Sequence, residues 1–67
     1  MRTRKLAKKM TIVLSVEEAR KKGIDNLESE ITGELRKFAE EKGWANHHIT
    51  FDAIDGAFVY TVVEDHV

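Results

Sequence analysis

The fold of this chain is decided by residues 47–63, which read HHITFDAIDGAFVYTVV. Two segments rich in β-branched and aromatic residues flank Asp55-Gly56, and such segments are typical of paired strands. An Asp-Gly pair favours a two-residue type I′ turn, because Gly56 adopts a positive φ at little cost and because the twist of this turn matches that of the strands. The sequence therefore predicts a β-hairpin over these residues.

The two-residue turn also predicts which residues of the two strands face each other. Ile54 should face Ala57, and the partners then run outward to Ile49 and Val62, with side chains alternating between the two faces. One face gathers apolar residues and is expected to join the core: Ile49, Phe51, Ala53, Phe58, Tyr60 and Val62. The other face is mixed in polarity: His48, Thr50, Asp52, Ile54, Ala57, Val59, Thr61 and Val63.

A further strand and a helical region are expected before the hairpin. Residues 10–14, MTIVL, form a short apolar run that is typical of a covered strand. Ser15 and Glu18 match a capping box, so a helix should begin there and continue with an apolar stripe to the C-terminal stop at Gly43. Gly23 lies within this pattern and indicates a break or kink of the helix between residues 22 and 25.

These elements predict an α+β fold with the order β-α-β-β in residues 10–67, preceded by a flexible basic arm in residues 1–9. A right-handed crossover makes the first two strands parallel in direction, so pairing of the first with the third gives a three-stranded antiparallel sheet in the order 1-3-2. One helical layer then covers one face of the sheet. The other face stays bare, and four of its residues are predicted to form an oligomer interface: Ile54, Val59, Thr61 and Val63.

Size also favours self-association. A chain of 67 residues buries only about 60% of the surface that its unfolded form exposes. The sequence contains no cysteine, so neither a disulfide nor a thiolate metal site can stabilise the fold. We therefore expect a homo-oligomer, with a dimer as the first expectation.

Charge is distributed unevenly along the chain. The net charge is −1, yet five of the 11 basic residues precede the first acidic residue, Glu17. A basic segment attached to an acidic remainder is consistent with contacts to nucleic-acid phosphates or to an acidic surface of its own partner. The composition favours a solvated tail over both. The residues predicted to contact phosphates in the first case are Arg2, Arg4, Lys5, Lys8 and Lys9.

A metal site and a stacking platform are the other candidates that the sequence offers. His47, Glu64 and His66 fall on one face near the open end of the hairpin, and two imidazoles with a carboxylate can bind a divalent cation. Rim residues of a sheet often have the same composition. Trp44 follows the helix and is expected to cover the end of the core, although an exposed indole can also stack on a base or a flavin.

The expected function is a non-enzymatic interaction or regulatory module that self-associates through its open sheet face and binds a macromolecular partner. The sequence contains no Gly-x-Ser-x-Gly, phosphate-loop or His-Glu-x-x-His pattern and no cysteine nucleophile, and no cofactor is expected. One alternative is a nucleic-acid-binding protein that uses its N-terminal basic residues. Another is a small hydrolase or ribonuclease that depends on His47 and His48 or on a metal. The absence of a membrane segment and of an export signal predicts a cytoplasmic protein.

Overall fold

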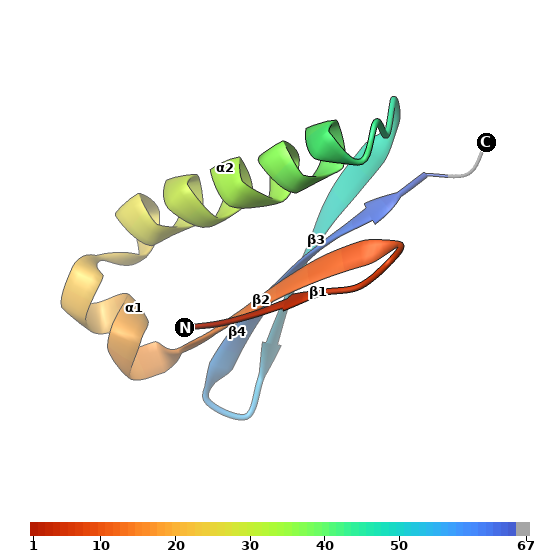
Figure 1. The fold of residues 1–67 in the computed structure, drawn as a ribbon. Coiled ribbons are helices and arrows are strands. Elements are labelled where there is room, and N and C mark those ends of the chain that lie inside the picture. The colour runs from red at the N-terminus through yellow and green to blue at the C-terminus, as the bar shows by residue number, and fades with distance from the viewer. Residues whose placement is uncertain (66–67) are drawn as a thin grey trace.

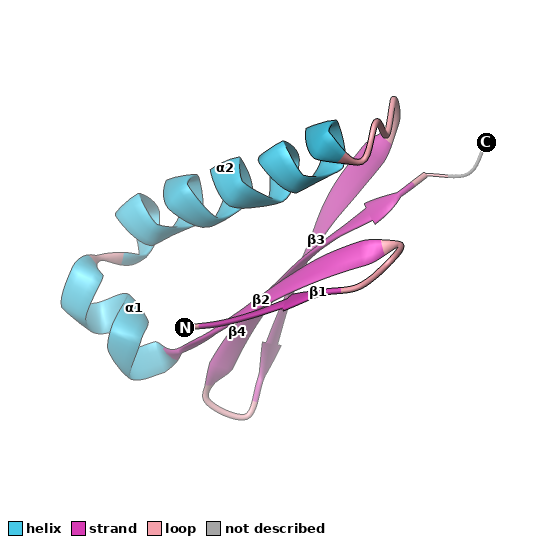
Figure 2. Ribbon diagram, in the orientation of Figure 1, coloured by secondary structure: helices cyan, strands magenta, loops and turns pink. Residues whose placement is uncertain are grey.

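The computed structural model describes residues 1–65, which form a four-stranded antiparallel sheet with two helices on one of its faces (Figure 1, Figure 2). The strands lie in the order β1-β2-β4-β3. Their bounds, with those of the helices, are β1 Arg2–Lys5, β2 Lys9–Ser15, α1 Val16–Lys22, α2 Ile24–Glu41, β3 His47–Ile54 and β4 Ala57–Glu64. The α+β class is thus confirmed, while the predicted three-stranded β-α-β-β arrangement was wrong in its number of strands.

Strands β3 and β4 form the predicted hairpin. Asp55 and Gly56 have φ values of 38° and 76°, as a type I′ turn requires. Ile54 is paired with Ala57, and the pairing continues to His47 and Glu64 at the open end. The turn therefore determines which residues of both strands face the helices and which face away.

The additional strand, β1, comes from the segment that the sequence predicts to be a flexible arm. Arg2 is paired with Val13 and Lys5 with Met10, and the backbone N–H of Leu6 donates to the carbonyl of Lys9 at 2.8 Å to close the turn. All four residues of β1 are exposed, so this strand contributes almost nothing to the core. It forms because its backbone satisfies the hydrogen-bonding groups at the edge of β2. Backbone hydrogen bonds need no apolar side chains, so the hydrophobic pattern of the sequence does not reveal this strand.

The predicted break in the helical region is confirmed at Gly23, which has φ 83° and separates α1 from α2. The capping box at the start of α1 is present as well. The backbone N–H of Glu18 donates to the Ser15 hydroxyl at 3.2 Å, and the Ser15 N–H donates to the Glu18 carboxylate at 3.4 Å. These contacts satisfy backbone donors that a helix N-terminus otherwise leaves free.

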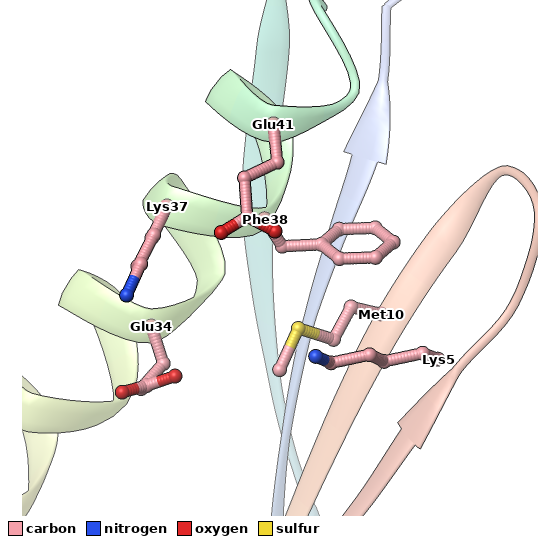
Figure 3. Close-up of a pocket in the computed structure, with 6 residues that line it drawn as sticks. All are labelled: Lys5, Met10, Glu34, Lys37, Phe38 and Glu41. Atoms are coloured by element: carbon pink, nitrogen blue, oxygen red, sulfur yellow. The ribbon is translucent and has the colours of Figure 1, made fainter.

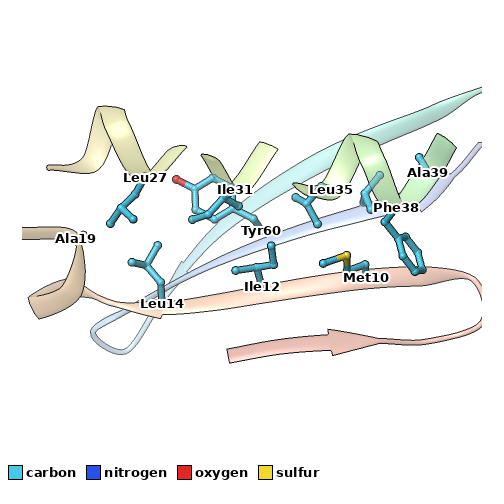
Figure 4. Close-up of a cluster of buried hydrophobic side chains, with 11 residues drawn as sticks. Met10, Ile12, Leu14, Ala19, Leu27, Ile31, Leu35, Phe38, Ala39 and Tyr60 are labelled. Atoms are coloured by element: carbon cyan, nitrogen blue, oxygen red, sulfur yellow. The ribbon is translucent and has the colours of Figure 1, made fainter. Parts of the chain in front are cut away.

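The core lies between α2 and the central strands β2 and β4 (Figure 4). Its buried residues are Met10, Ile12, Leu14, Ala19, Leu27, Ile31, Leu35, Phe38, Ala39, Tyr60 and Val62. Phe51, which the sequence predicts to be in the core, is 54% exposed, and this prediction was wrong. Its ring packs on Tyr60 and Phe58, with ring centroids 4.9 and 5.7 Å away. Phe51 is nevertheless exposed because its strand, β3, lies at an edge of the sheet, whereas the helical layer packs mainly on the inner strands.

Candidate interaction surface

The face of the sheet opposite the helices is a continuous surface built from all four strands. The pairing of the strands aligns its residues in rows across the sheet. One row is Arg2, Val13, Val59 and Asp52, and the next is Arg4, Thr11, Thr61 and Thr50. We call this surface the open face. It is basic at the β1 end of the first row and acidic at the β3 end.

The middle of the open face consists of β-branched side chains on β2 and β4. Val13, Val59, Thr61 and Val63 are only partly buried, and Ile54 at the turn end is 53% exposed. The hydroxyls of Thr11 and Thr61 lie 3.3 Å apart and satisfy each other across the two strands. The open face therefore offers apolar surface whose central hydroxyls already have a partner, so a second surface can cover it with little loss of hydrogen bonds to water.

The predicted interface residues Ile54, Val59, Thr61 and Val63 all lie on this face, as the strand register requires. The sequence did not reveal that Thr11 and Val13 of β2 extend the same surface. The alternation of Thr11 and Val13 with Met10, Ile12 and Leu14 carries that signal, but residues 10–14 are almost wholly apolar, which hides the difference between the two faces.

The basic residues predicted to act together are divided between the two faces. Arg2, Arg4 and Lys9 line a groove with Leu6, Thr11 and Val13 on the open face. Lys5 belongs to the other face, because it is paired with the buried Met10. Lys8 lies in the turn between β1 and β2. The formation of β1 thus places three of the five cations along one edge of the open face.

The predicted metal ligands are only partly brought together. His47 and Glu64 are paired across β3 and β4, as predicted, whereas His66 lies outside the described residues. Within residues 1–65, no group of three or more His, Asp or Glu side chains could hold a metal ion.

The two neighbouring histidines do not share a site. Consecutive residues of a strand point to opposite faces, so His47 lies on the helix side and His48 on the open face. Nδ1 of His48 contacts a carboxylate oxygen of Asp65, whereas Nδ1 of His47 is buried and has no hydrogen-bond partner among residues 1–65. This division gives no support to a reaction in which both imidazoles act on one substrate.

Trp44 covers one end of the core. Its indole is partly buried and packs edge-to-face on Phe38, with ring centroids 5.5 Å apart and planes at 83°. The backbone N–H of Trp44 donates to the carbonyl of Ala39 at 3.0 Å and so holds the chain against the end of α2. The side chain occupies the structural position expected of it, and its ring packs on the core.

A small hollow between β1, β2 and α2 is lined by side chains of both charges (Figure 3). Its lining residues are Lys5, Met10, Glu34, Lys37, Phe38 and Glu41. The volume is about 80 Å³, far below the roughly 300–1,000 Å³ of typical ligand pockets. We regard it as a gap between an edge strand and a helix.

An ion pair links the N-terminus to α1. The ammonium group of Met1 lies 2.5 Å from the Glu18 carboxylate and, with the backbone N–H of Ser15, holds the pKa of Glu18 below its usual value. Because the folded state lowers this pKa, the contact is present at neutral pH and is lost as the pH falls and Glu18 takes up a proton. In the core, burial and the nearby Glu28 raise the pKa of the Tyr60 hydroxyl.

Comparisons with protein-family models, with curated proteins and with solved structures found no match for this chain. Neither helix within residues 1–65 is long and apolar enough to cross a membrane. The fold and the surface thus define a small α+β protein whose sheet carries helices on one face, and functional conclusions depend on its own geometry.

Proposed function

We propose that this protein is a non-enzymatic interaction module that self-associates through its open face, as a dimer in the simplest case, and binds a macromolecular partner. The observation that carries the proposal is the row of aliphatic side chains in the middle of the open face. Apolar surface of this kind is stabilised when a second surface removes it from water, by about 25 cal/mol per Å² of area buried.

The charges of the open face favour a second copy of the chain as its occupant. Two sheets that pack face to face can be related by a two-fold axis that runs along the strands between them. This axis places β1 of one copy over β3 of the other. Arg2 then lies over the partner's Asp52, while Val13 and Val59 meet the partner's Val59 and Val13. The first row is therefore complementary to itself in both charge and apolar content.

Replacing Val59 with lysine is expected to dissociate the face-to-face assembly. Val59 lies near the middle of the row, so the substitution places a charge from each copy in the desolvated centre of the interface. Sedimentation velocity at low micromolar concentration should give a smaller folded species for Val59→Lys than for the unchanged protein, because the open-face contact is lost. Ser29→Lys, on the exposed surface of α2, adds the same charge and should leave the oligomer intact. Equal sedimentation of both variants and the unchanged protein would refute use of the open face.

A second candidate function is binding of nucleic acid along the basic edge of the open face. The groove lined by Arg2, Arg4 and Lys9 supports it, because three cations beside the Thr11 hydroxyl form a row suited to successive phosphates. This function and the face-to-face dimer use overlapping residues. The dimer covers Arg2 with a carboxylate, whereas nucleic acid needs Arg2 free.

Salt dependence of binding tests this second candidate. If Arg2, Arg4 and Lys9 each contact a phosphate, the affinity for a 20-base-pair DNA duplex should fall with a log–log salt slope of about −3. Fluorescence anisotropy measures it. The triple alanine variant of these residues should lose the binding, and a control with Arg20, Lys21 and Lys22 replaced by alanine should retain it. Deletion of residues 1–9 is unsuitable, because it removes all of β1 and the first residue of β2. A flat salt dependence would exclude the candidate.

A further inference from the structure

Strand β3 is a long and uncovered edge of the sheet. It has eight residues, and Thr50 to Ile54 are all exposed, including Phe51 on the helix side and Ile54 on the open face. It contains no lysine, proline or glycine, the residues that commonly protect an edge strand from pairing with another chain. Its only acidic residue is Asp52.

The other edge of the sheet has the opposite character. Strand β1 has four residues, and three of them, Arg2, Arg4 and Lys5, are basic. A short and charged edge resists pairing with a second copy of itself, because like charges would face each other. The two edges therefore differ in the way expected if one is protected from pairing and the other is used for it.

The backbone of β3 presents free hydrogen-bonding groups at every second residue. Asp65 N–H donates to the carbonyl of Asn46 at 3.0 Å, which shows that the even-numbered residues of this segment bond to β4. In an antiparallel pair the alternate residues direct their N–H and C=O groups away from that partner. For β3 these are His47, Ile49, Phe51 and Ala53, and no other strand within the described residues 1–65 pairs with this row of groups along the edge.

We propose that two copies of this chain join by antiparallel pairing of β3 with β3 of the second copy, about a two-fold axis through Thr50. This register sets Thr50 opposite the partner's Thr50. It places Ile49 opposite the partner's Phe51 on the helix side, and Asp52 opposite the partner's His48 on the open face. Each of the last two pairs occurs twice, because the axis exchanges the copies.

Charge and shape favour this register over those centred on the two following residues, Phe51 and Asp52. A pairing centred on Phe51 sets Asp52 opposite the partner's Thr50 and brings no imidazole to its carboxylate. A pairing centred on Asp52 sets two carboxylates against each other, which is destabilising. Centring on Thr50 gives a threonine pair, two aromatic–aliphatic pairs and two histidine–carboxylate pairs, all of which are favourable across antiparallel strands. His48 uses Nδ1 for Asp65, and its Nε2 is the ring nitrogen that remains for the partner's Asp52.

The edge pairing explains the exposure of Phe51. In a single copy the ring is 54% exposed beside Phe58 and Tyr60, and the partner's Ile49 would cover part of it. The four-stranded sheet becomes one of eight strands, with the helices of both copies on the same side. Both open faces also lie on one side and remain free, so this contact adds to the face-to-face association and does not depend on it.

Hydrogen exchange of the unchanged protein tests the pairing directly. At concentrations where the protein is oligomeric, the amides of Ile49 and Phe51 should exchange at least about tenfold more slowly than in a dilute sample, since each donates to the partner's strand. Face-to-face packing forms no hydrogen bond with these amides, so it does not produce this effect. Equal exchange of both amides at the two concentrations would overturn the proposal.

Cysteine cross-linking tests the register. The sequence contains no native cysteine, so only the introduced thiols can form a disulfide. Thr50→Cys places the two thiols in a directly opposed, non-hydrogen-bonded pair, where Cα atoms are about 4.5 Å apart, and mild oxidation should give mostly covalent dimer. Ile54→Cys is the control, because Ile54 lies on the same strand and the same face as Thr50 and is also exposed. In the proposed register the two introduced cysteines are eight positions apart along the paired strands, so this variant should remain monomeric on a denaturing gel. Equal cross-linking of the two variants would refute the register.

A charge exchange in the Thr50→Cys protein keeps the test independent of that single substitution. Adding His48→Asp sets two carboxylates opposite each other and should slow cross-linking severalfold. Adding Asp52→His as well recreates a histidine–carboxylate pair and should restore the cross-linking rate. Recovery of the contact with Asp65 cannot explain this result, because residue 48 is then a carboxylate. No restoration would overturn the pairing of His48 with Asp52. Adding Val59→Lys to Thr50→Cys should leave cross-linking unchanged, so failure of the open-face proposal and failure of this one are distinguishable.

Discussion

Replacing Val62 with aspartate is expected to abolish the fold. Val62 is 0% exposed in the central strand β4, where it is paired with Met10 and Ile49, and an aspartate there would be a buried carboxylate without a cation or donor. A cost of more than about 4 kcal/mol is typical of such a charge and equals the roughly 3–5 kcal/mol that a core of this size supplies. Circular dichroism should show an unfolded chain at 25 °C.

The neighbouring residue provides the matched control. Val63 belongs to the same strand but points to the open face, between Lys9 and His48. Val63→Asp should therefore remain folded, with its carboxylate near a lysine, and should weaken self-association by placing a charge in the proposed interface. If both variants unfold, or if Val62→Asp retains the spectrum and stability of the unchanged protein, the assignment of the two faces is wrong.

Leu35→Ala is expected to have the second largest effect on stability. Leu35 is 0% exposed on the side of α2 that faces the sheet (Figure 4). Truncation removes buried methyl groups and leaves a cavity, which in comparable cores lowers the free energy of unfolding by about 3–5 kcal/mol. In a chain this small, a large fraction of the molecules should be unfolded without denaturant. Urea titration followed by circular dichroism measures the change.

Arg36→Ala is the control for Leu35→Ala, because Arg36 is the next residue of α2 and is exposed. Alanine has the higher helix propensity, so this substitution should change the free energy of unfolding by less than about 0.5 kcal/mol. A loss of less than 1 kcal/mol for Leu35→Ala, or an equal loss for both variants, would contradict the placement of α2 on the sheet.

The sequence predicts the hairpin well because its information is local. Asp55-Gly56 determines the turn, and the turn determines the pairing of Ile54 with Ala57 and of every later pair. The break between the helices is equally local, since Gly23 adopts a positive φ that other residues rarely take. Both features depend on neighbouring residues alone, with no need to know where the helices lie.

Features that depend on distant contacts could not be predicted in the same way. Strand β1 has no apolar alternation, and only the free edge of β2 gives its backbone a partner. Phe51 has the pattern of a core residue, but its exposure depends on which strands α2 covers, and the helix leaves β3 at the edge. The chain signals that Phe51 is apolar, whereas its neighbours in the folded state decide how much of the ring is covered.

The same distinction applies to the candidate surface. Ile54, Val59, Thr61 and Val63 share a face because the register of one hairpin requires it. The alignment of Arg2 with Asp52 across four strands follows only when β1 is in place. The charge complementarity of the open face is therefore a property of the whole sheet. The sequence already indicates the apolar surface, and the charges favour a second copy of the chain as its partner.

The most direct test of the account is the mass of the unchanged, folded protein in solution across concentrations from low micromolar upward. Light scattering after size exclusion should give an average mass that rises with concentration and reaches at least twice the 7.7 kDa of the single chain. A folded species of 7.7 kDa at every concentration would contradict self-association through the open face and through β3 alike.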